Sequence, residues 1–398
     1  TGLYSSAASD VYKRQGVAWP SMQATFGVPL DALGILLITS RIGIIFSSFA
    51  SGRLTTLLGI GLLMILGSGV RMAALLGYAI APSWTAMLLI SIVAGAGGGL
   101  VTAGLNTYFA VNHGARLMNW LHASFGLGAM LGPILMTAIL NGGSSWRWGY
   151  AVTAVLQLLV GIGLMATLSG WTLASDGVTG SSADHADAKG KPHDDEPDPS
   201  LEQRPQSARL WRRGILWLSL ALFFVSAGIE STAGQWTFSL FTESRMVPIA
   251  VAGAWVSIYW GCFTAGRILF GFVAERWPER WVIRAGALLS AFAALLLWIN
   301  IGPAAGFVSL ALLGLALAPI SPLLTTSTPE RLGQRDAPSG IGFQVGAASI
   351  GVALLPALAG LLAERINLEI IPLFLLLSTI VFSLLYEATQ IRMRSSQP

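Results

Sequence analysis

The chain has 398 residues, of which 54% are hydrophobic and only 11% are charged. In a soluble protein about a quarter of the residues are charged, so this composition excludes a soluble globular protein. The apolar residues form blocks of about 20, the length with which a helix crosses the hydrocarbon of a membrane. Because backbone polar groups in lipid must bond within helices, we expect an all-α integral membrane protein. The single cysteine, Cys262, excludes an internal disulfide and a cysteine-based metal cluster, and we predict neither a metal nor a cofactor.

The chain begins with a polar stretch, residues 1–15, which cannot span lipid and resembles a non-native tail. Residues 16–28, GVAWPSMQATFGV, are typical of the outer end of a helix, so we expect a first span that is truncated. Further apolar segments predict eleven membrane-spanning helices. Their ranges are 31–51, 59–80, 84–110, 117–140, 147–170, 214–240, 249–274, 281–301, 304–326, 338–362 and 369–389.

Segment 171–213, between two of these spans, is rich in Asp, Ser, Gly and Pro and is typical of a disordered linker. Residues recur across it at a constant distance. The pairs 219 residues apart are Gly52 with Gly271, Gly34 with Gly253 and Arg116 with Arg335, and Gly126 and Gly346 are 220 apart. Two parallel repeats predict an N-terminal bundle over 16–170 and a C-terminal bundle over 214–390, with a tail at 391–398. Two six-helix bundles related by an axis along the membrane normal resemble the major facilitator fold, which has twelve spans.

Basic residues gather on one set of loops and set the expected orientation. This set includes Arg53, Arg116, Arg212, Arg213, Arg276, Arg280, Arg331, Arg335 and Arg394, whereas the opposite loops carry Arg147, Arg245 and Arg365. Cytoplasmic loops carry an excess of Lys and Arg, so we expect the linker and the C-terminal tail in the cytoplasm, beneath a plasma or inner membrane. Basic residues spread over loops in this way set topology and do not predict nucleic-acid binding.

The segment GRILFGFVAERWPER, residues 266–280, resembles the cytoplasmic signature loop of the major facilitator superfamily. An acid at a helix end can pair with an arginine and hold two helices together until the protein rocks. The resemblance implies a conformational gate. Its predicted residues are Gly52, Arg267, Gly271, Glu275, Arg276 and Arg280. The alternative is that these charges only set topology. The first-half copy, SGRLTTLLG, has Thr56 where the acid is expected, so gate control is expected to rest on the second copy.

Glu230 lies within the apolar segment FFVSAGIESTAGQW, and no other acid lies as deep in a predicted span. A carboxylate in hydrocarbon is costly, so its default interpretation is a functional group that faces a cavity. The alternative is a fixed ion pair with Arg41, Arg71 or Arg267. Gln235 offers hydrogen-bond donors and acceptors to a solute. Trp236 offers a ring face, although it lies about 240° around the helix from Glu230 and could face lipid.

AGIESTAGQW and the first-half segment GLNTYFAVNHGARLMNWLHASFGLGAMLGP resemble the fucose and glucose–proton symporter branch of the superfamily. That branch often has an acid four residues before the position of Asn106, where this chain has Thr102. Proton coupling therefore rests on Glu230, with Arg41, Arg71, Thr102 and Asn106 as further candidates. His122 could titrate or could be a packing histidine. Gln344 and Asn106 are either cavity groups or bridges between helices.

We therefore expect a secondary transporter that moves a small polar solute, a sugar in the first instance, by alternating access with protons, or with sodium. The alternative is a proton-coupled exporter of amphipathic compounds, which the partial antiporter signature at Gly128, Gly132 and Pro133 favours weakly; small residues at this spacing are more often plain helix packing. Four histidines without metal-site spacing, and no G-x-S-x-G motif, argue against an intramembrane enzyme. The expected partners are the solute and the lipid bilayer, with the chain as a monomer.

Overall fold

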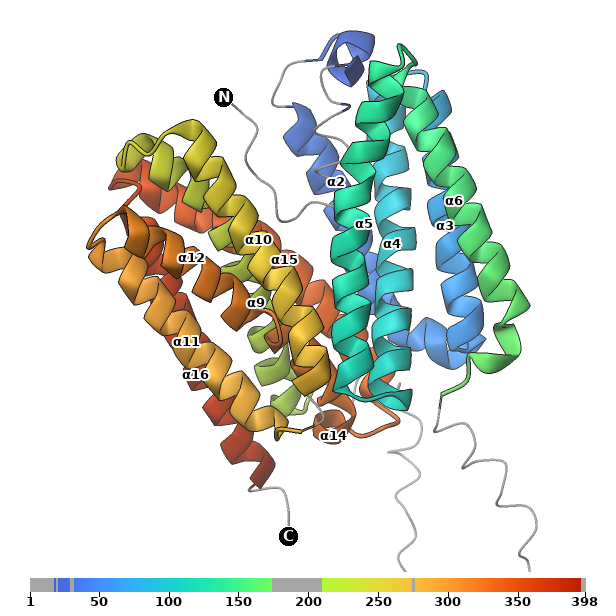
Figure 1. Cartoon of the computed structure of the whole chain (residues 1–398). Coiled ribbons are helices and arrows are strands. Elements are labelled where there is room, and N and C mark those ends of the chain that lie inside the picture. Colours follow the sequence, from blue (N-terminus) through green and yellow to red (C-terminus); the bar gives the residue numbers. More distant parts are fainter. Residues whose placement is uncertain (1–17, 19–20, 29–31, 174–209, 274–275, 395–398) are drawn as a thin grey trace, which may run out of the picture.

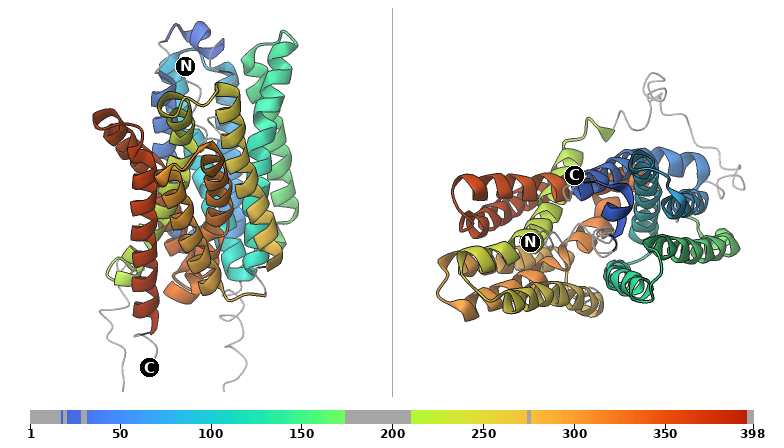
Figure 2. Two further views of the ribbon diagram at one scale, coloured as in Figure 1. Left: turned by 60° about the vertical axis from the view of Figure 1, so that its left-hand side comes forward. Right: turned by 90° about the horizontal axis from the view of Figure 1, so that it is seen from above.

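The computed structural model describes residues 18, 21–28, 32–173, 210–273 and 276–394, and their regular elements are all helices. The first bundle contains α2 (Ala32–Leu58), α3 (Ile60–Ile80), α4 (Trp84–Asn112), α5 (Ala115–Asn141) and α6 (Trp146–Ala166). The second contains α9 (Gly214–Ser239), α10 (Ile249–Val273), α11 (Glu279–Ile299), α12 (Pro303–Leu317), α13 (Ile320–Thr326), α14 (Thr328–Leu332), α15 (Ala337–Arg365) and α16 (Ile370–Arg394). The bundles lie side by side (Figure 1, Figure 2).

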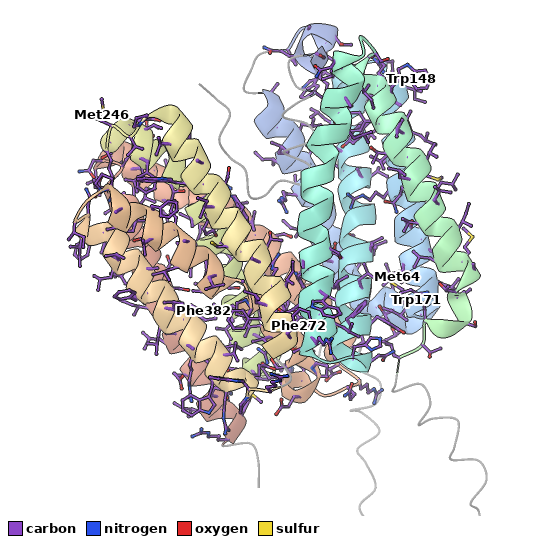
Figure 3. The ribbon with its side chains drawn as sticks, viewed as in Figure 1. Met64, Trp148, Trp171, Met246, Phe272 and Phe382 are labelled. Carbon is purple, nitrogen blue, oxygen red and sulfur yellow. The ribbon has the colours of Figure 1, made fainter. Side chains whose placement is uncertain are left out.

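Within the described residues, nine helical segments are long and apolar enough to cross a membrane. Exposed tryptophans lie near the ends of these segments, as they do where a helix meets a membrane interface. Trp148 marks the upper end of α6 in Figure 3, and Trp277 and Trp281 flank the start of α11. The predicted all-α integral membrane class is thereby confirmed.

The predicted spans agree with the observed helices to within a few residues at most boundaries. The predicted span over 304–326 corresponds to the apolar segment Pro303–Thr326, but this segment has an internal break, because α12 ends at Leu317 and α13 begins at Ile320. Pro319 lies between them and Pro322 follows within α13. Proline has no N–H to donate and its ring clashes with the preceding turn, which breaks a helix. The two prolines in APISP, residues 318–322, predict this break from the sequence alone.

The predicted outer end of a first helix is helical over residues 21–26. Met22 is fully buried in a cluster at the upper end of the first bundle. The indole N–H of Trp146 donates to the hydroxyl of Thr25 over 3.0 Å, and the hydroxyl of Tyr150 lies 3.8 Å from the sulfur of Met22. This segment therefore packs against the start of α6. The predicted tail, residues 1–15, lies outside the described residues.

The predicted linker, residues 171–213, falls mostly outside the described residues, but its two ends are packed. Trp171 lies against Tyr108 of α4, with 4.6 Å between ring centroids. At the other end, Trp211 stacks on Phe343 of α15 at 4.6 Å and also contacts Phe49 of α2. Ordered packing thus extends into the predicted linker from both bundles.

The 219-residue repeat in the sequence recurs as a repeat of contacts between helices. A Cβ on Gly67 would lie 3.1 Å from the carbonyl oxygen of Gly97, and one on Gly286 would lie 2.8 Å from that of Ala316. Gly95 has no room for a Cβ because it lies against the Ser40 carbonyl. Gly314 lies in the same way against the Tyr259 carbonyl. Each of these pairs maps onto the other by adding 219 to both numbers, so the two bundles use one packing scheme.

Contacts between the two bundles are also repeated at a distance of 219 residues. Gly52 of α2 lies directly against Ser339 of α15, and Gly271 of α10 lies against Trp120 of α5. These contacts are again 219 residues apart at both partners. In Figure 1 the bundles converge toward the end where α14 lies and diverge toward the opposite end. We call the first end the closed end and the second the open end.

Candidate functional site

Glu230 of α9 is paired with Arg267 of α10. The guanidinium Nη2 lies 3.8 Å from the carboxylate Oε2, and the side chains are 10% and 22% exposed for Arg267 and Glu230. Of the three arginines that the sequence offered as ion-pair partners, the structure brings Arg267 to the carboxylate. A charge that is partly removed from water needs such a counter-charge to be tolerated.

Arg267 also reaches the other bundle. Its Nη1 lies 3.5 Å from the carbonyl oxygen of His122 on α5, and its guanidinium carbon lies 4.1 Å from the ring centroid of Phe263. One arginine therefore contacts a carboxylate in its own bundle and a backbone carbonyl across the junction. The counter-charge of Glu230 therefore also takes part in a contact between the two halves.

Tyr259 is a member of this site that sequence reasoning missed. Its side chain is fully buried, and its hydroxyl donates to the carbonyl oxygen of Glu230 over 3.1 Å. The hydrogen bond joins a side chain of α10 to a backbone carbonyl of α9, and hydrophobic periodicity within either helix does not predict such a contact. The repeat offered a signal, because Tyr259 stands where the first bundle has Ser40, next to a helix-packing glycine.

Gln235 and Trp236 are held by groups other than Glu230. The amide of Gln235 donates to the hydroxyl of Ser231 over 2.8 Å. The indole N–H of Trp236 donates to the carbonyl oxygen of Pro356 over 2.8 Å, and its ring packs onto Gly360 of α15. Trp236 thus faces α15, in keeping with its position around the helix. The predicted contacts of both side chains with a solute stay predictions.

Gln344 joins three helices of the second bundle at full burial. Its amide donates to the hydroxyl of Ser219 on α9 over 2.7 Å, and its amide oxygen accepts from the hydroxyl of Thr328 on α14 over 3.0 Å. Both hydrogen bonds are made within the protein. Of the two roles that the sequence left open, the geometry favours a bridge between helices.

The first-bundle candidates lie on helices separate from Glu230. Asn106 is buried and Thr102 half-buried on α4, while Arg41 and Arg71 are half-buried on α2 and α3. The side chain of Arg71 passes over Gly98, where a Cβ would lie 3.0 Å from its Nη1. The glycine run at 95–100 therefore makes room for neighbouring helices and for this side chain.

His122 lies on α5 where the two bundles meet. Its ring Nε2 is buried and has no hydrogen-bond partner within the described part of the chain. Its carbonyl oxygen lies 3.5 Å from Arg267, so the residue touches the site through its backbone. The two roles that the sequence offered for His122, a titrating group and a packing histidine, both stay predictions.

The predicted gate residues divide into packed and exposed groups. Gly52 and Gly271 are buried at the contacts between the bundles, whereas Arg276 and Arg280 are exposed at the start of α11. Next to Gly271, the guanidinium of Arg116 lies 4.6 Å from the ring of Trp120, which in turn contacts Phe272. Glu275 lies outside the described residues, so its predicted role stays a prediction.

Two parallel repeats of membrane-spanning helices, with a partly buried ion pair close to their junction, are typical of a polytopic membrane transporter. The profile of the Major Facilitator Superfamily matches residues 6–246 and also residues 218–392. The chain belongs to the major facilitator superfamily. This confirms the predicted family and makes the protein a transporter rather than an enzyme.

Two curated relatives cover most of the chain. Sodium-dependent glucose transporter 1A of Mus musculus is 26% identical over 370 residues, which are 81% of each chain. Bypass of stop codon protein 6 of Saccharomyces cerevisiae is 24% identical over 391 residues, which are 93% of this chain and 77% of that protein.

Two solved structures share the fold. FucP in its outward conformation, the fucose:proton symporter of E. coli, has a TM-score of 0.74 at 18% identity, over 96% of this chain and 95% of its own. The proton:xylose symporter XylE has a TM-score of 0.73 at 14% identity, over 95% and 91%. The predicted likeness to the fucose permease branch therefore holds at the level of the fold.

Proposed function

We propose that this protein moves a small polar solute, a sugar in the first instance, across the membrane together with protons by alternating access. The observation that carries the proposal is the Glu230–Arg267 pair, which joins α9 to α10 where α10 meets α5 of the other bundle. A carboxylate that takes up a proton loses its attraction for the arginine. Arg267 is then released to change its contact with the carbonyl of His122.

This linkage gives the proton a means to act on the contact between the bundles. Alternating access in a two-repeat transporter is the rocking of one bundle against the other around a fixed site. A ligand shifts such an equilibrium only by binding the two states differently. Glu230 meets that requirement, because its counter-charge Arg267 touches the opposite bundle in the closed-end arrangement and would lose that contact when this end opens.

The sugar class is supported by the relatives and by the chemistry near the pair. FucP and XylE are named for fucose and xylose, and the mouse relative is named for glucose with sodium. Sugar hydroxyls need both donors and acceptors, which the guanidinium of Arg267 and the carboxylate of Glu230 supply. Sodium remains the alternative coupling ion. We further propose that the closed end faces the cytoplasm, because the basic loops cluster at that end.

The test is uptake by the purified chain in proteoliposomes. Labelled fucose, glucose and xylose are offered under an inward proton gradient, and separately under a sodium gradient, to the parent and to Glu230→Gln. We expect the parent to accumulate one of these sugars with the proton gradient. Glu230→Gln should lose at least about 90% of that accumulation, because a neutral amide cannot carry the proton. It should keep sugar exchange at equal concentrations on the two sides.

The matched control is Glu387→Gln, which removes a carboxylate that pairs with Arg284 on the outer helices α11 and α16. We expect this variant to accumulate sugar as the parent does. Proton-driven accumulation that survives Glu230→Gln would contradict the coupling role. Extrusion of hydrophobic dyes without uptake of any sugar would instead establish the exporter.

A further inference from the structure

A basic pocket lies at the closed end of the second bundle, away from the Glu230 site. Its volume is about 430 Å³. Its lining includes four arginines, Arg212, Arg213, Arg331 and Arg392, and one acid, Glu330. They come from the residues that precede α9, from α14 and from the end of α16. Three separate segments thus contribute arginines to the lining of one pocket.

Two of the four arginines are fixed in place by hydrogen bonds. Arg331 is only 6% exposed, and its guanidinium donates to the carbonyl oxygens of Leu324 and Ser327 and to the hydroxyl of Ser219. Arg213 donates to the carbonyl oxygen of Leu332 over 2.6 Å and pairs with Asp336 over 3.1 Å. Their positive charges are held at set positions before any ligand arrives, which lowers the cost of binding one.

The pocket also receives the N-terminus of α9, a helix of 26 residues that begins at Gly214. The residue before it, Arg213, makes no side-chain cap to the helix. Free N–H groups and the helix dipole at such an end favour an anion. The guanidinium of Arg392 lies over Gly214, where a Cβ would come within 2.7 Å of it, so the arginine is placed close to the start of α9.

The charges around the pocket nearly balance but leave it positive. Glu330 lines it, Asp336 pairs with Arg213, and Glu279 acts electrostatically on Arg331. The lining itself has four arginines and one carboxylate, Asp336 and Glu279 offset part of this excess from outside the lining, and the helix N-terminus adds its partial positive charge. A ligand with one or two negative charges on a compact tetrahedral group matches this field, and paired guanidinium donors suit phosphate oxygens.

We propose that this pocket binds a phosphate group, carried either by a phospholipid headgroup or by a soluble phosphate. Two exposed apolar side chains on the flanking helices, Trp217 of α9 at 56% and Ile391 of α16 at 67%, place the pocket beside the membrane interface. A bound phosphate would join the starts of α9 and α14 to the end of α16. Its expected effect is to stabilise the second bundle without touching the solute site.

The experiment measures binding to the full chain with two probes. Inorganic phosphate is titrated against the purified protein in uncharged detergent, and the lipid arm compares nanodiscs of phosphatidylglycerol with nanodiscs of phosphatidylcholine by thermal unfolding. The test variant is Arg212→Gln/Arg392→Gln, which leaves Arg213 and Arg331 in place. We expect this variant to bind whichever probe the parent binds at least about tenfold more weakly, because it loses charge-assisted hydrogen bonds to the phosphate.

The matched control is Arg276→Gln/Arg280→Gln, which removes two exposed arginines near the start of α11, outside the pocket. It should bind as the parent does, and both double variants should unfold at the parent's temperature without a probe. Stabilisation by phosphatidylglycerol alone assigns the ligand as lipid, and stabilisation by phosphate alone assigns it as soluble. No response to either probe, or equal loss in the control, would overturn the proposal.

Discussion

The two contacts that close the bundles against each other occupy equivalent positions but differ in chemistry. Between α2 and α15 small residues approach closely, with Gly52 against Ser339 and Gly342 against Ser48 and Ser51, beside the aromatic pair of Phe49 and Phe343. Between α5 and α10 the equivalent of Ser48 is Arg267, and the equivalent of Ser339 is Trp120. The junctions therefore differ in that the first brings backbones close together and the second contains a charged side chain, Arg267, that pairs with Glu230. On the function proposed above, the first junction supplies shape and the second supplies the response to a proton.

The largest effect is expected from breaking the charged junction. Arg267→Met leaves Glu230 without its counter-charge and should lower the free energy of unfolding by on the order of 2–3 kcal/mol. Arg267→Met/Glu230→Gln should recover at least half of this loss, because no unpaired charge remains. Unfolding in mixed micelles measures both variants.

The control for this prediction lies at the equivalent position of the other junction. The hydroxyl of Ser48 is buried without a hydrogen-bond partner in the described part of the chain. Ser48→Ala should therefore change the free energy of unfolding by less than about 0.5 kcal/mol. A loss at Ser48 as large as that at Arg267 would remove the distinction between the junctions.

A smaller effect is expected from adding one methyl group to each junction. A Cβ on Gly52 meets the backbone of Ser339, whereas a Cβ on Gly271 meets the indole of Trp120. Backbone cannot turn aside as a side chain can, so Gly52→Ala should weaken the closed end by about 1–3 kcal/mol and Gly271→Ala by less. The readout is the rate at which a maleimide labels Ser48→Cys in a Cys262→Ser background.

In that assay Gly52→Ala should speed labelling by about tenfold over the parent background, in line with the loss of packing. Gly271→Ala should speed it by a smaller factor. If Gly271→Ala speeds labelling more than Gly52→Ala does, then the aromatic junction and not the small-residue junction sets the closed end.

The smallest effect concerns two arginines at the open end. Arg147 donates to the carbonyl oxygens of Ala79 and Ala81, which do not titrate, over 3.0 and 2.9 Å. Arg245 donates to both carboxylate oxygens of Glu369, and these hydrogen bonds lower the pKa of that carboxyl. Because the folded pKa is depressed, this stabilisation is present above the ordinary glutamate pKa and is lost as pH falls through the folded value.

Unfolding at pH 7 and near pH 3 compares the parent with Glu369→Gln and Arg147→Gln. Glu369 is more than a third exposed, so its contribution at pH 7 is expected to stay under about 1 kcal/mol and to shrink at low pH. The cost of Arg147→Gln should be the same at both pH values. A cost of Glu369→Gln that does not change with pH would contradict the ion-pair account.

Hydropathy and the repeat were sufficient to predict the architecture, because membrane thickness fixes helix length and a duplicated sequence fixes symmetry. They could not fix the rotation of each helix about its axis. That rotation decides which of Arg41, Arg71 and Arg267 meets Glu230, why Trp236 faces α15, and why Tyr259 bonds to a helix carbonyl. Rotation is set by packing against neighbours, and single-sequence patterns carry little of that information.

The contacts repeated at 219 residues have a consequence for how such a chain can evolve. Duplication of a half leaves two copies of the same packing instructions, of which the glycine contacts are preserved in both. Divergence is then free to act on the positions between them, as it has where Ser48 in one copy is Arg267 in the other. A lineage can alter its cargo or its coupling ion through such positions while the inherited scaffold continues to fold.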